Sequence, residues 1–513
     1  MNNLFTNLGS WKAMSFAFVL LFPSPYLATQ AVCGEKNSIE ATQQIPRIVG
    51  VAKINPTTVE VLFSDNHRMT LDFYGENIFR MFQDDDGILR DPEAEPEAKI
   101  LVSQPRKTVT QLDAKDTAGA VIISTGKIEV QIDKATSLMK VVNLATGNTV
   151  MEAAAPILFE KDKVTVTLKE NPQEYFYGGG VQNGRFSHKG RAIAIENQNS
   201  WTDGGVASPN PFYWSTNGYG LMWHTFKRGA YDFGRKEKGI VKLSHQTDYL
   251  DLFIMVNDGA VPLLNDYYQL TGNPVLLPKF GFYQGHLNAY NRDYWTEDEN
   301  GILFEDGKRY KESQKENGCI KESLNGEKDN YQFSARAVID RYKQHDMPLG
   351  WLLPNDGYGA GYGQTGTLDG NIQNLKSLTD YAHQNGVEIG LWTQSDLHPK
   401  AGVEALLQRD IVKEVRDAGV RVLKTGYSFG LNGITDVAQI MTYYGNDARP
   451  FIISLDGWAG TQRYAGIWSG DQTGGNWEYI RFHIPTYIGS GLSGNPNITS
   501  DMDGIFGGKN LVV

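Results

Sequence analysis

The sequence predicts an N-terminal β-sandwich followed by a (β/α)8-type barrel of class α/β. From about residue 45 to 275, short runs alternate apolar and polar side chains, as in 58–63, 127–132 and 164–168. Period-two runs are typical of half-buried strands, and many of them with regular turns indicate a sandwich. After Pro278 the pattern changes to strands that alternate with helices, which indicates a parallel sheet.

Acidic or aromatic residues stand at the ends of most of the strands expected after residue 280. In a β/α barrel the carboxyl ends of all strands converge on one face, whereas a doubly wound sheet concentrates its contacts at one switch point. Acidic and aromatic residues at many strand ends therefore favour the barrel over a doubly wound sheet. The expected strands are 280–285, 349–354, 387–392, 420–424, 450–454, 464–468 and 498–503.

The barrel is expected to be incomplete at strand eight. The sequence ends at Val513, soon after the expected seventh strand, and the segment 511–513 is too short to judge as an eighth. With 513 residues, the chain is longer than one core usually serves. We expect a sandwich domain over 45–275 and a truncated barrel domain over 276–513.

Two segments depart from these patterns. Residues 297–330 are polar and charged, which predicts a surface insertion. Residues 174–180 are rich in glycine and aromatic residues. We interpret them as a tight sheet corner that needs positive φ, because no helix with the Lys and Thr of a phosphate site follows.

Composition excludes several classes of partner. The net charge of −11 and the pI near 5.4 argue against nucleic acid and against an anionic membrane surface. There is no P-loop, no dinucleotide-binding fingerprint, no HExxH motif and no cluster of Cys and His. We therefore expect no cofactor, no metal and a neutral substrate. The sequence does not indicate an oligomeric state.

Residues 1–32 have the features of a secretory signal. Lys12 precedes an apolar core over 14–22, small residues follow, and the core is too short to span a bilayer. No other segment is apolar enough for a transmembrane span, so we expect a secreted or periplasmic protein. Lipid anchoring through Cys33 is the second-ranked alternative, because Gln30-Ala31-Val32 matches the usual small-residue approach poorly.

The stretch 449–477 holds the main candidate site. Two expected strands each deliver a carboxylate at or just past their ends, Asp456 and Asp471, with Arg463 between them. Trp458 and Trp468 lie beside these acids in the sequence. A carboxylate can donate or take protons and an indole can support the C–H face of a sugar, so the stretch predicts a carbohydrate site.

This stretch also resembles a known family. Trp458-Ala459-Gly460-Thr461-Gln462-Arg463-Tyr464, followed by Trp468-Ser469-Gly470-Asp471, resembles the signature of glycoside hydrolase family 31. The segments 351–358 and 500–503 fit the second and seventh barrel strands of that family. Members are retaining α-glycosidases with a β-sandwich before a β/α barrel, and the similarity is greatest to bacterial secreted members, some of which act on α-galactosides.

The resemblance implies a two-carboxylate retaining mechanism on an oligosaccharide or polysaccharide. One carboxylate attacks the anomeric carbon, while the other protonates the leaving oxygen and later activates water, the two groups lying about 5–5.5 Å apart. Asp471 falls on the acid/base position, and Trp468 and Trp477 could supply the desolvation that raises its pKa. The structural alternative is that Asp471 caps a turn or helix.

The nucleophile expected from the resemblance is missing. The family carries an Asp at the end of the fourth barrel strand, usually just after a Lys. Here Lys424 is followed by Thr425 and Gly426, and no acid occurs before Asp436, which is better interpreted as a helix N-cap. The loop after the fourth strand is therefore expected to be shortened, and Lys424 could still face the site.

The resemblance implies further sugar contacts. Asp356 would bind sugar hydroxyls, unless it only forms a turn in Asn-Asp-Gly. Trp392 and Trp458 would line the sugar subsite, with core packing as the alternative for Trp392. Arg463 would bind a hydroxyl and orient Asp471, unless it forms a structural ion pair.

Asp456 and Leu455 depart from the family pattern, which has a Ser following an Arg at these positions. This departure favours an α-galactoside over an α-glucoside as substrate. Three hypotheses stay open: a retaining α-glycosidase that is weak or inactive, a carbohydrate-binding or vestigial protein without catalysis, and a damaged gene product that does not fold. No roles are assigned to Asp501 and Asp503.

Overall fold

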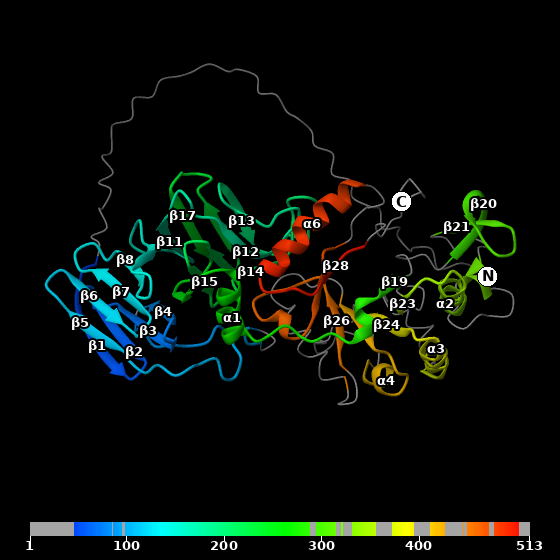
Figure 1. The fold of residues 1–513 in the computed structure, drawn as a ribbon, viewed down its shortest axis with the longest axis horizontal. Helices are drawn as coiled ribbons and strands as arrows, with labels where there is room; N and C mark the ends of the chain where they lie inside the picture. The colour runs from blue at the N-terminus through cyan, green and yellow to red at the C-terminus, as the bar shows by residue number, and fades with distance from the viewer. Residues whose placement is uncertain are drawn as a thin grey trace, which may run out of the picture. The chain divides into compact units, whose positions relative to one another are not determined.

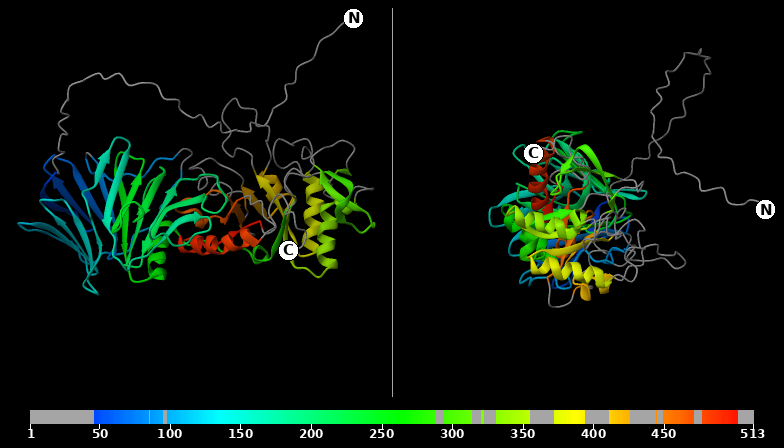
Figure 2. Two further views of the ribbon diagram at one scale, coloured as in Figure 1. Left: turned by 90° about the horizontal axis from the view of Figure 1, so that it is seen from above. Right: turned by 90° about the vertical axis from the view of Figure 1, so that its right-hand side faces the viewer.

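The N-terminal half of the computed structural model consists of antiparallel sheets (Figures 1 and 2). The structure describes residues 46–84, 86–94, 98–287, 294–313, 320–321, 331–354, 372–393, 411–425, 444, 449–470 and 477–501. All of them belong to one compact unit, Ile45–Val513. The expected signal segment lies outside the described residues, and the expected boundary at 275/276 stays a prediction.

Three antiparallel sheets make up this half, with strand orders β1-β2-β3-β4-β18-β15-β14-β12, β10-β11-β17-β16-β13 and β5-β6-β7-β8-β9. Their bounds are β1 Ile48–Asn55, β2 Thr58–Phe63, β3 Arg68–Gly75, β4 Ile78–Asp84, β5 Asp113–Asp116, β6 Ala120–Ser124, β7 Ile128–Asp133, β8 Met139–Asn143, β9 Asn148–Glu152, β10 Leu158–Glu160, β11 Lys163–Lys169, β12 Phe176–Gln182, β13 Arg191–Ile195, β14 Val206–Ser215, β15 Tyr219–Trp223, β16 Gly229–Phe233, β17 Ile240–His245 and β18 Leu250–Val256. The period-two runs found in the sequence are β2, β7 and β11, so the predicted sandwich is confirmed.

Aromatic residues fill the space between the first two of these sheets. Tyr213 of β14 packs against Phe233 of β16 at 5.0 Å between ring centroids, and Phe176 of β12 stacks on Phe233 at 4.7 Å. All three side chains are buried. Burial of such large apolar surfaces is the main favourable contribution to holding the two sheets together.

The glycine-rich stretch forms part of β12. Gly178, Gly179 and Gly180 have φ values of 118°, 79° and 79°, and the pairing of β12 with β14 shifts register between Gly178 and Gly180. Residues other than glycine rarely adopt such φ values. The expected positive φ is therefore confirmed, and the three glycines let β12 bulge inside a sheet.

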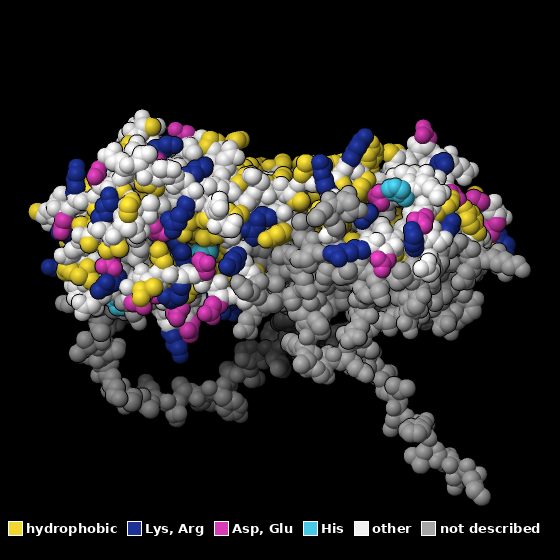
Figure 3. Space-filling model, turned by 90° about the horizontal axis from the view of Figure 1, so that it is seen from below, with side chains coloured by type: hydrophobic (Ala, Val, Ile, Leu, Met, Phe, Trp, Pro, Cys, Tyr) yellow, Lys and Arg dark blue, Asp and Glu magenta, His cyan; other side chains and the backbone are white. Residues whose placement is uncertain are grey.

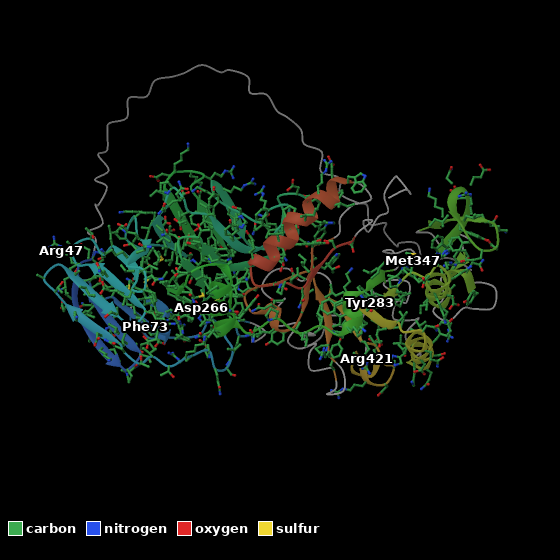
Figure 4. The ribbon with its side chains drawn as sticks, in the orientation of Figure 1. Arg47, Phe73, Asp266, Tyr283, Met347 and Arg421 are labelled. Carbon is green, nitrogen blue, oxygen red and sulfur yellow. The ribbon has the colours of Figure 1, made fainter. Side chains whose placement is uncertain are left out.

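A helix links the sandwich to the barrel. α1, Ala260–Thr271, carries the buried residue Asp266, which is labelled in Figure 4. Its Oδ2 accepts hydrogen bonds from Asn77 at 2.8 Å and Asn257 at 3.2 Å. Burial nevertheless raises the pKa of Asp266 to about 6.

The C-terminal half is built on a seven-stranded sheet whose strands pair in parallel and in the order of the sequence. Sequential order without reversal is the arrangement of a barrel wall and differs from a doubly wound sheet. Within the described residues the barrel is incomplete, as predicted. The strands are β19 Gln284–Leu287, β23 Leu349–Leu353, β24 Glu388–Thr393, β25 Val422–Thr425, β26 Phe451–Ser454, β27 Gly466–Trp468 and β28 Ile498–Thr499.

The first barrel strand begins later than expected. Lys279–Phe282 forms a 3-10 turn (η1), and β19 starts at Gln284. The turn places Phe280 edge-on to Phe451 of β26, with ring centroids 5.6 Å apart. The strand predicted over 280–285 was therefore wrong for its first residues, which form a turn with no buried side chain.

The described residues of the C-terminal half include the helices α2 Ala335–Gln344, α3 Ile372–Gln384, α4 Ile411–Arg416 and α6 Trp477–Leu492. α2 and α3 pack on the barrel strands β23 and β24, whereas α6 packs mainly on β12 of the sandwich. Ser334 caps α2, because its side chain accepts a hydrogen bond from the Ala337 N–H at 3.1 Å. The helix whose N-cap was expected at Asp436 lies outside the described residues except for Tyr444. Among the described residues no helix has the length and apolar character needed to cross a membrane.

The described part of the expected insertion has a sheet of its own. β20 Tyr294–Leu303 pairs antiparallel with β21 Arg309–Ser313 and with β22 Ile320–Lys321. Trp295 and Tyr310 pack with Phe333 into a small separate core. The polar composition predicted the surface position of this segment but did not predict its strands.

Candidate active site

The ends of neighbouring barrel strands bring several predicted site residues together. In the β25–β26 pairing Lys424 lies opposite Ile453, and in the β27–β28 pairing Trp468 lies opposite Thr499. Because these strands are parallel, the residues at their carboxyl ends meet at one edge of the sheet.

A strand-end cluster of Lys424, Trp468 and Asp501 forms at this edge. The Lys424 ammonium lies 3.8 Å from the ring centroid of Trp468, and the Trp468 indole N–H donates to Asp501 Oδ2 at 3.2 Å. Lys424 and Trp468 are 2% and 5% exposed. A buried cation against an indole face is a favourable contact. The sequence alone assigned no role to Asp501. The structure shows that its carboxylate accepts a hydrogen bond from the Trp468 indole.

Asp456 lies just past the end of β26 and is buried. Its Oδ1 accepts a hydrogen bond from the Asn197 side chain, and its backbone carbonyl accepts one from Ser454 Oγ at 2.7 Å. Asn197 belongs to a segment over 196–205, called here the sandwich loop, which connects β13 to β14. The sandwich therefore contributes directly to the barrel strand ends.

The sandwich loop makes a second contact at these strand ends. A Cβ added to Gly470 would lie 2.3 Å from Cβ of Trp201, so the Trp201 side chain packs directly on the Gly470 backbone. Sequence reasoning missed both Asn197 and Trp201. A tryptophan among Asn, Asp and Gly in a polar loop was the available signal, but nothing in the chain before residue 275 linked it to the barrel.

Trp458 and Arg463 lie at the junction between barrel and sandwich. The Trp458 indole N–H donates to the Thr225 carbonyl at 2.8 Å. The Arg463 guanidinium donates to the carbonyls of Lys99 at 2.6 Å and Ile100 at 3.0 Å. For both residues this geometry favours a structural role over a contact with a sugar hydroxyl.

Gln462 completes this junction. Its Nε2 donates to Thr271 Oγ1 and to the Gly272 carbonyl, each at 2.9 Å, at the end of α1. Trp458, Gln462 and Arg463 are called here the junction residues. The recognisable motif 458–464 therefore holds the barrel against the preceding chain, which sequence reasoning did not anticipate.

Several predicted site residues lie outside what the structure describes. These are Asp471, Asp356, the side chain of Trp392, and the segment 426–443 that follows β25. The backbone of Trp392 is described, and in the β24–β25 pairing it lies opposite Lys424. The roles expected for Asp471, Asp356 and Trp392 stay predictions.

The described residues hold no group of three or more His, Cys, Asp or Glu side chains arranged to bind a metal. On the visible face in Figure 3, Lys and Arg side chains are interspersed with Asp and Glu.

Helix α6 carries a histidine with a shifted pKa. Burial lowers the pKa of His483, whose ring stacks on that of Tyr487 with ring centroids 5.8 Å apart.

Family models match both halves of the chain. The model of the glycosyl hydrolase 31 N-terminal galactose mutarotase-like domain matches residues 68–232, and that of the glycosyl hydrolases family 31 TIM-barrel domain matches residues 421–510. The sandwich, the parallel barrel sheet and these matches define a barrel-type glycoside hydrolase architecture. The chain belongs to glycoside hydrolase family 31.

Curated relatives include an α-xylosidase of Saccharolobus solfataricus, which is 21% identical over 386 residues, covering 63% of this chain and 46% of the relative. A probable glucan 1,3-α-glucosidase of Arabidopsis thaliana is 32% identical over 130 residues, covering 25% of this chain and 14% of the relative. The chain thus spans less than half the length of these two relatives.

Solved structures share the fold. A GH31 dextranase of Flavobacterium johnsoniae complexed with glucose has a TM-score of 0.71 at 15% identity, covering 90% of this chain and 61% of that one. A GH31 α-xylosidase from a soil metagenome complexed with xylose has a TM-score of 0.65 at 15% identity, covering 89% and 72%.

Proposed function

We propose that this chain binds an α-linked sugar at the carboxyl ends of β25 to β28, in the manner of a retaining α-glycosidase. The observation that supports this proposal is the convergence of Lys424, Asp456 and Trp468 from three adjacent strands of the barrel sheet. A buried indole beside charged side chains offers both an apolar surface for the sugar ring and hydrogen-bond partners for its hydroxyls.

Asp471 is the proposed general acid/base. In a retaining mechanism this group protonates the leaving oxygen as the bond to the anomeric carbon breaks, and it later takes a proton from the attacking water. Trp468 precedes Asp471 by three residues and is buried. An apolar neighbour raises the pKa of a carboxyl, which keeps the acid protonated for the first step.

The proposed activity is weak, because the sequence offers no carboxylate between Lys424 and Asp436 to serve as nucleophile. The same observation favours the second candidate function, carbohydrate binding without catalysis. Both functions use the same strand ends and differ only in whether a glycosyl-enzyme forms.

The proposed substrate is an α-galactoside or α-glucoside, with secretion directed by residues 1–32. The relatives are named α-glucosidases and α-xylosidases, whereas Asp456 and Leu455 depart from the family pattern in a way that favours a galactoside. An α-xyloside therefore belongs in the assay as a third substrate.

The deciding experiment measures hydrolysis of nitrophenyl α-galactoside, α-glucoside and α-xyloside by the full chain. Four proteins are compared: wild type, Asp471→Asn, and two variants that return a carboxylate after Lys424, Thr425→Asp and Gly426→Asp. We expect little or no turnover by wild type and measurable turnover by one of the restored variants. Adding Asp471→Asn to that variant should lower its rate about 10²- to 10⁴-fold, the usual contribution of a general acid.

Calorimetric titration of the wild type with the matching methyl glycosides completes the test. Binding without turnover, even in the restored variants, would support the carbohydrate-binding function. Neither binding nor turnover in any of the four proteins would refute both candidate functions.

A further inference from the structure

The contact between Asn197 and Asp456 joins the sandwich to the end of a barrel strand. Asn197 lies 259 positions before Asp456 in the sequence, and its Nδ2 donates to Asp456 Oδ1. Asp456 is only 4% exposed. A hydrogen bond from an amide to a buried carboxylate is charge-assisted and therefore strong and directional.

The orientation of the Asn197 amide is fixed within its own loop. Asn197 Oδ1 accepts a hydrogen bond from the Asn199 backbone N–H at 2.8 Å. Because Oδ1 is bonded within this local turn, the NH₂ group of the same amide points towards Asp456. Asn199 itself has a φ of 50°, a conformation that asparagine tolerates well.

Further hydrogen bonds hold the sandwich loop in place. The Ser200 carbonyl accepts from Asn183 Nδ2 at 3.1 Å, and the Gln198 N–H donates to the Val206 carbonyl at 3.0 Å. Asn197 is therefore presented by an ordered loop, and its side chain fixes the carboxylate of Asp456 from one side.

We propose that Asn197 is a positioning residue that sets the orientation of the Asp456 carboxylate and thereby selects between sugars that differ in hydroxyl stereochemistry. This inference rests on the proposed function of the strand ends. Hydrogen bonds weaken steeply as their angle departs from linear, so a carboxylate held in one orientation distinguishes axial from equatorial hydroxyls. The selected class is α-galactosides over α-glucosides, which differ in one such hydroxyl.

The test uses the full chain and two probes, methyl α-galactoside and methyl α-glucoside, titrated calorimetrically. In Asn197→Ala the ratio of the galactoside to the glucoside dissociation constant should move towards one by about 10- to 140-fold, as expected for loss of a hydrogen bond to a charged group. Gln198→Ala is the matched control, because Gln198 lies in the same loop with an exposed side chain. Its ratio should equal that of wild type.

A swap of the two residues separates positioning from general loss of structure. Asn197→Asp faces one carboxylate with another and should lower the melting temperature. The double variant Asn197→Asp/Asp456→Asn reverses the donor and acceptor and keeps the local turn, so it should recover most of that melting temperature. It should not recover the galactoside preference, because position 456 then carries an amide.

The outcomes are distinct. Failure of wild type to bind either glycoside overturns the proposed function and this inference with it. If wild type binds but Asn197→Ala leaves the ratio of the two dissociation constants unchanged, this inference alone is overturned. The same follows if the double variant melts no higher than Asn197→Asp.

Discussion

The ammonium of Lys424 lies against the indole of Trp468, although β26 separates their strands in the sheet. In a β/α barrel, side chains that point inwards from alternate strands share one layer of the interior. Contact between residues of β25 and β27 is therefore the relationship expected inside a curled sheet, and it places the cation and the ring where a ligand at the strand ends would meet them.

The first prediction concerns the hydrogen bond between Trp468 and Asp501. Trp468→Phe keeps an aromatic face but removes the N–H that donates at 3.2 Å to Asp501. We expect the free energy of unfolding to fall by about 1–3 kcal/mol, measured by urea denaturation. Trp477→Phe, at an exposed tryptophan of α6, should change it by less than about 0.5 kcal/mol.

A double-mutant cycle with Asp501→Asn identifies the source of that loss. If the hydrogen bond is responsible, the two substitutions together should cost less than the sum of the single ones. Additive effects would assign the loss of stability to packing of the ring instead.

Much of the fold could be predicted from the sequence, because the spacing of apolar residues within a short segment indicates whether it forms a strand or a helix. β7 alternates buried and partly buried residues as its sequence does, and each expected barrel strand has a counterpart within a few residues. The 3-10 turn at Lys279–Phe282 was missed because a short apolar run does not distinguish a turn from a strand.

The candidate site was only partly readable, for a different reason. Asp456 and Trp468 follow apolar runs and were found from position alone. Asn197 could not be found, because its partner lies in the other half of the fold and no local pattern records that contact. The family resemblance implied a sugar contact for Arg463, whereas its guanidinium donates hydrogen bonds to the backbone carbonyls of residues 99 and 100.

The second prediction concerns the junction residues. Arg463→Gln removes two hydrogen bonds to backbone carbonyls, and Trp458→Phe removes the donor to the Thr225 carbonyl. Each should lower the free energy of unfolding by about 1–3 kcal/mol. If these residues serve the junction, the dissociation constants of the methyl glycosides should stay within about twofold of wild type. A much larger loss of sugar affinity in Arg463→Gln, with an unchanged free energy of unfolding, would indicate that Arg463 contacts the sugar.

The third prediction is a loss of stability in mild acid from two histidines of the sandwich. Burial lowers the pKa of His188 and of His245 to about 4, from an ordinary value of 6.5. The unfolded chain therefore binds protons between pH 6.5 and 4 that the folded chain does not. Stability is full above pH 6.5 and falls towards pH 4, by about 3 kcal/mol for each histidine.

Asp266 opposes this trend. Its pKa is raised to about 6 from 3.8, so the folded chain takes up that proton first and gains about 3 kcal/mol as the pH falls over the same range. These three groups together predict a net loss of about 3 kcal/mol, measured by thermal unfolding at pH 7 and pH 4. His188→Gln should halve the contribution of the two histidines, and His345→Gln, at an exposed position, should leave the pH profile unchanged.

The fourth prediction compares two glycines that share a positive φ but differ in their surroundings. Gly180 has a φ of 79°, and a Cβ there would lie 2.3 Å from the Ser208 carbonyl oxygen and 2.5 Å from the Asn210 nitrogen. Gly190 has a φ of 70°, and a Cβ there would meet no atom within 4 Å. Gly190→Ala should therefore cost only the backbone conformation, about 1–2 kcal/mol.

Gly180→Ala should cost considerably more, because both clashing atoms belong to the paired strand β14 and cannot move aside separately. Gly180 also exchanges hydrogen bonds with Ser493 beyond α6, its N–H donating at 3.0 Å and its carbonyl accepting at 3.2 Å. Displacing β12 would weaken this contact between the sandwich and the barrel. We expect a loss above about 4 kcal/mol or no folded protein, read from thermal unfolding and soluble yield. Equal losses in the two variants would show that φ alone determines the cost, and that β12 can shift without disturbing the barrel.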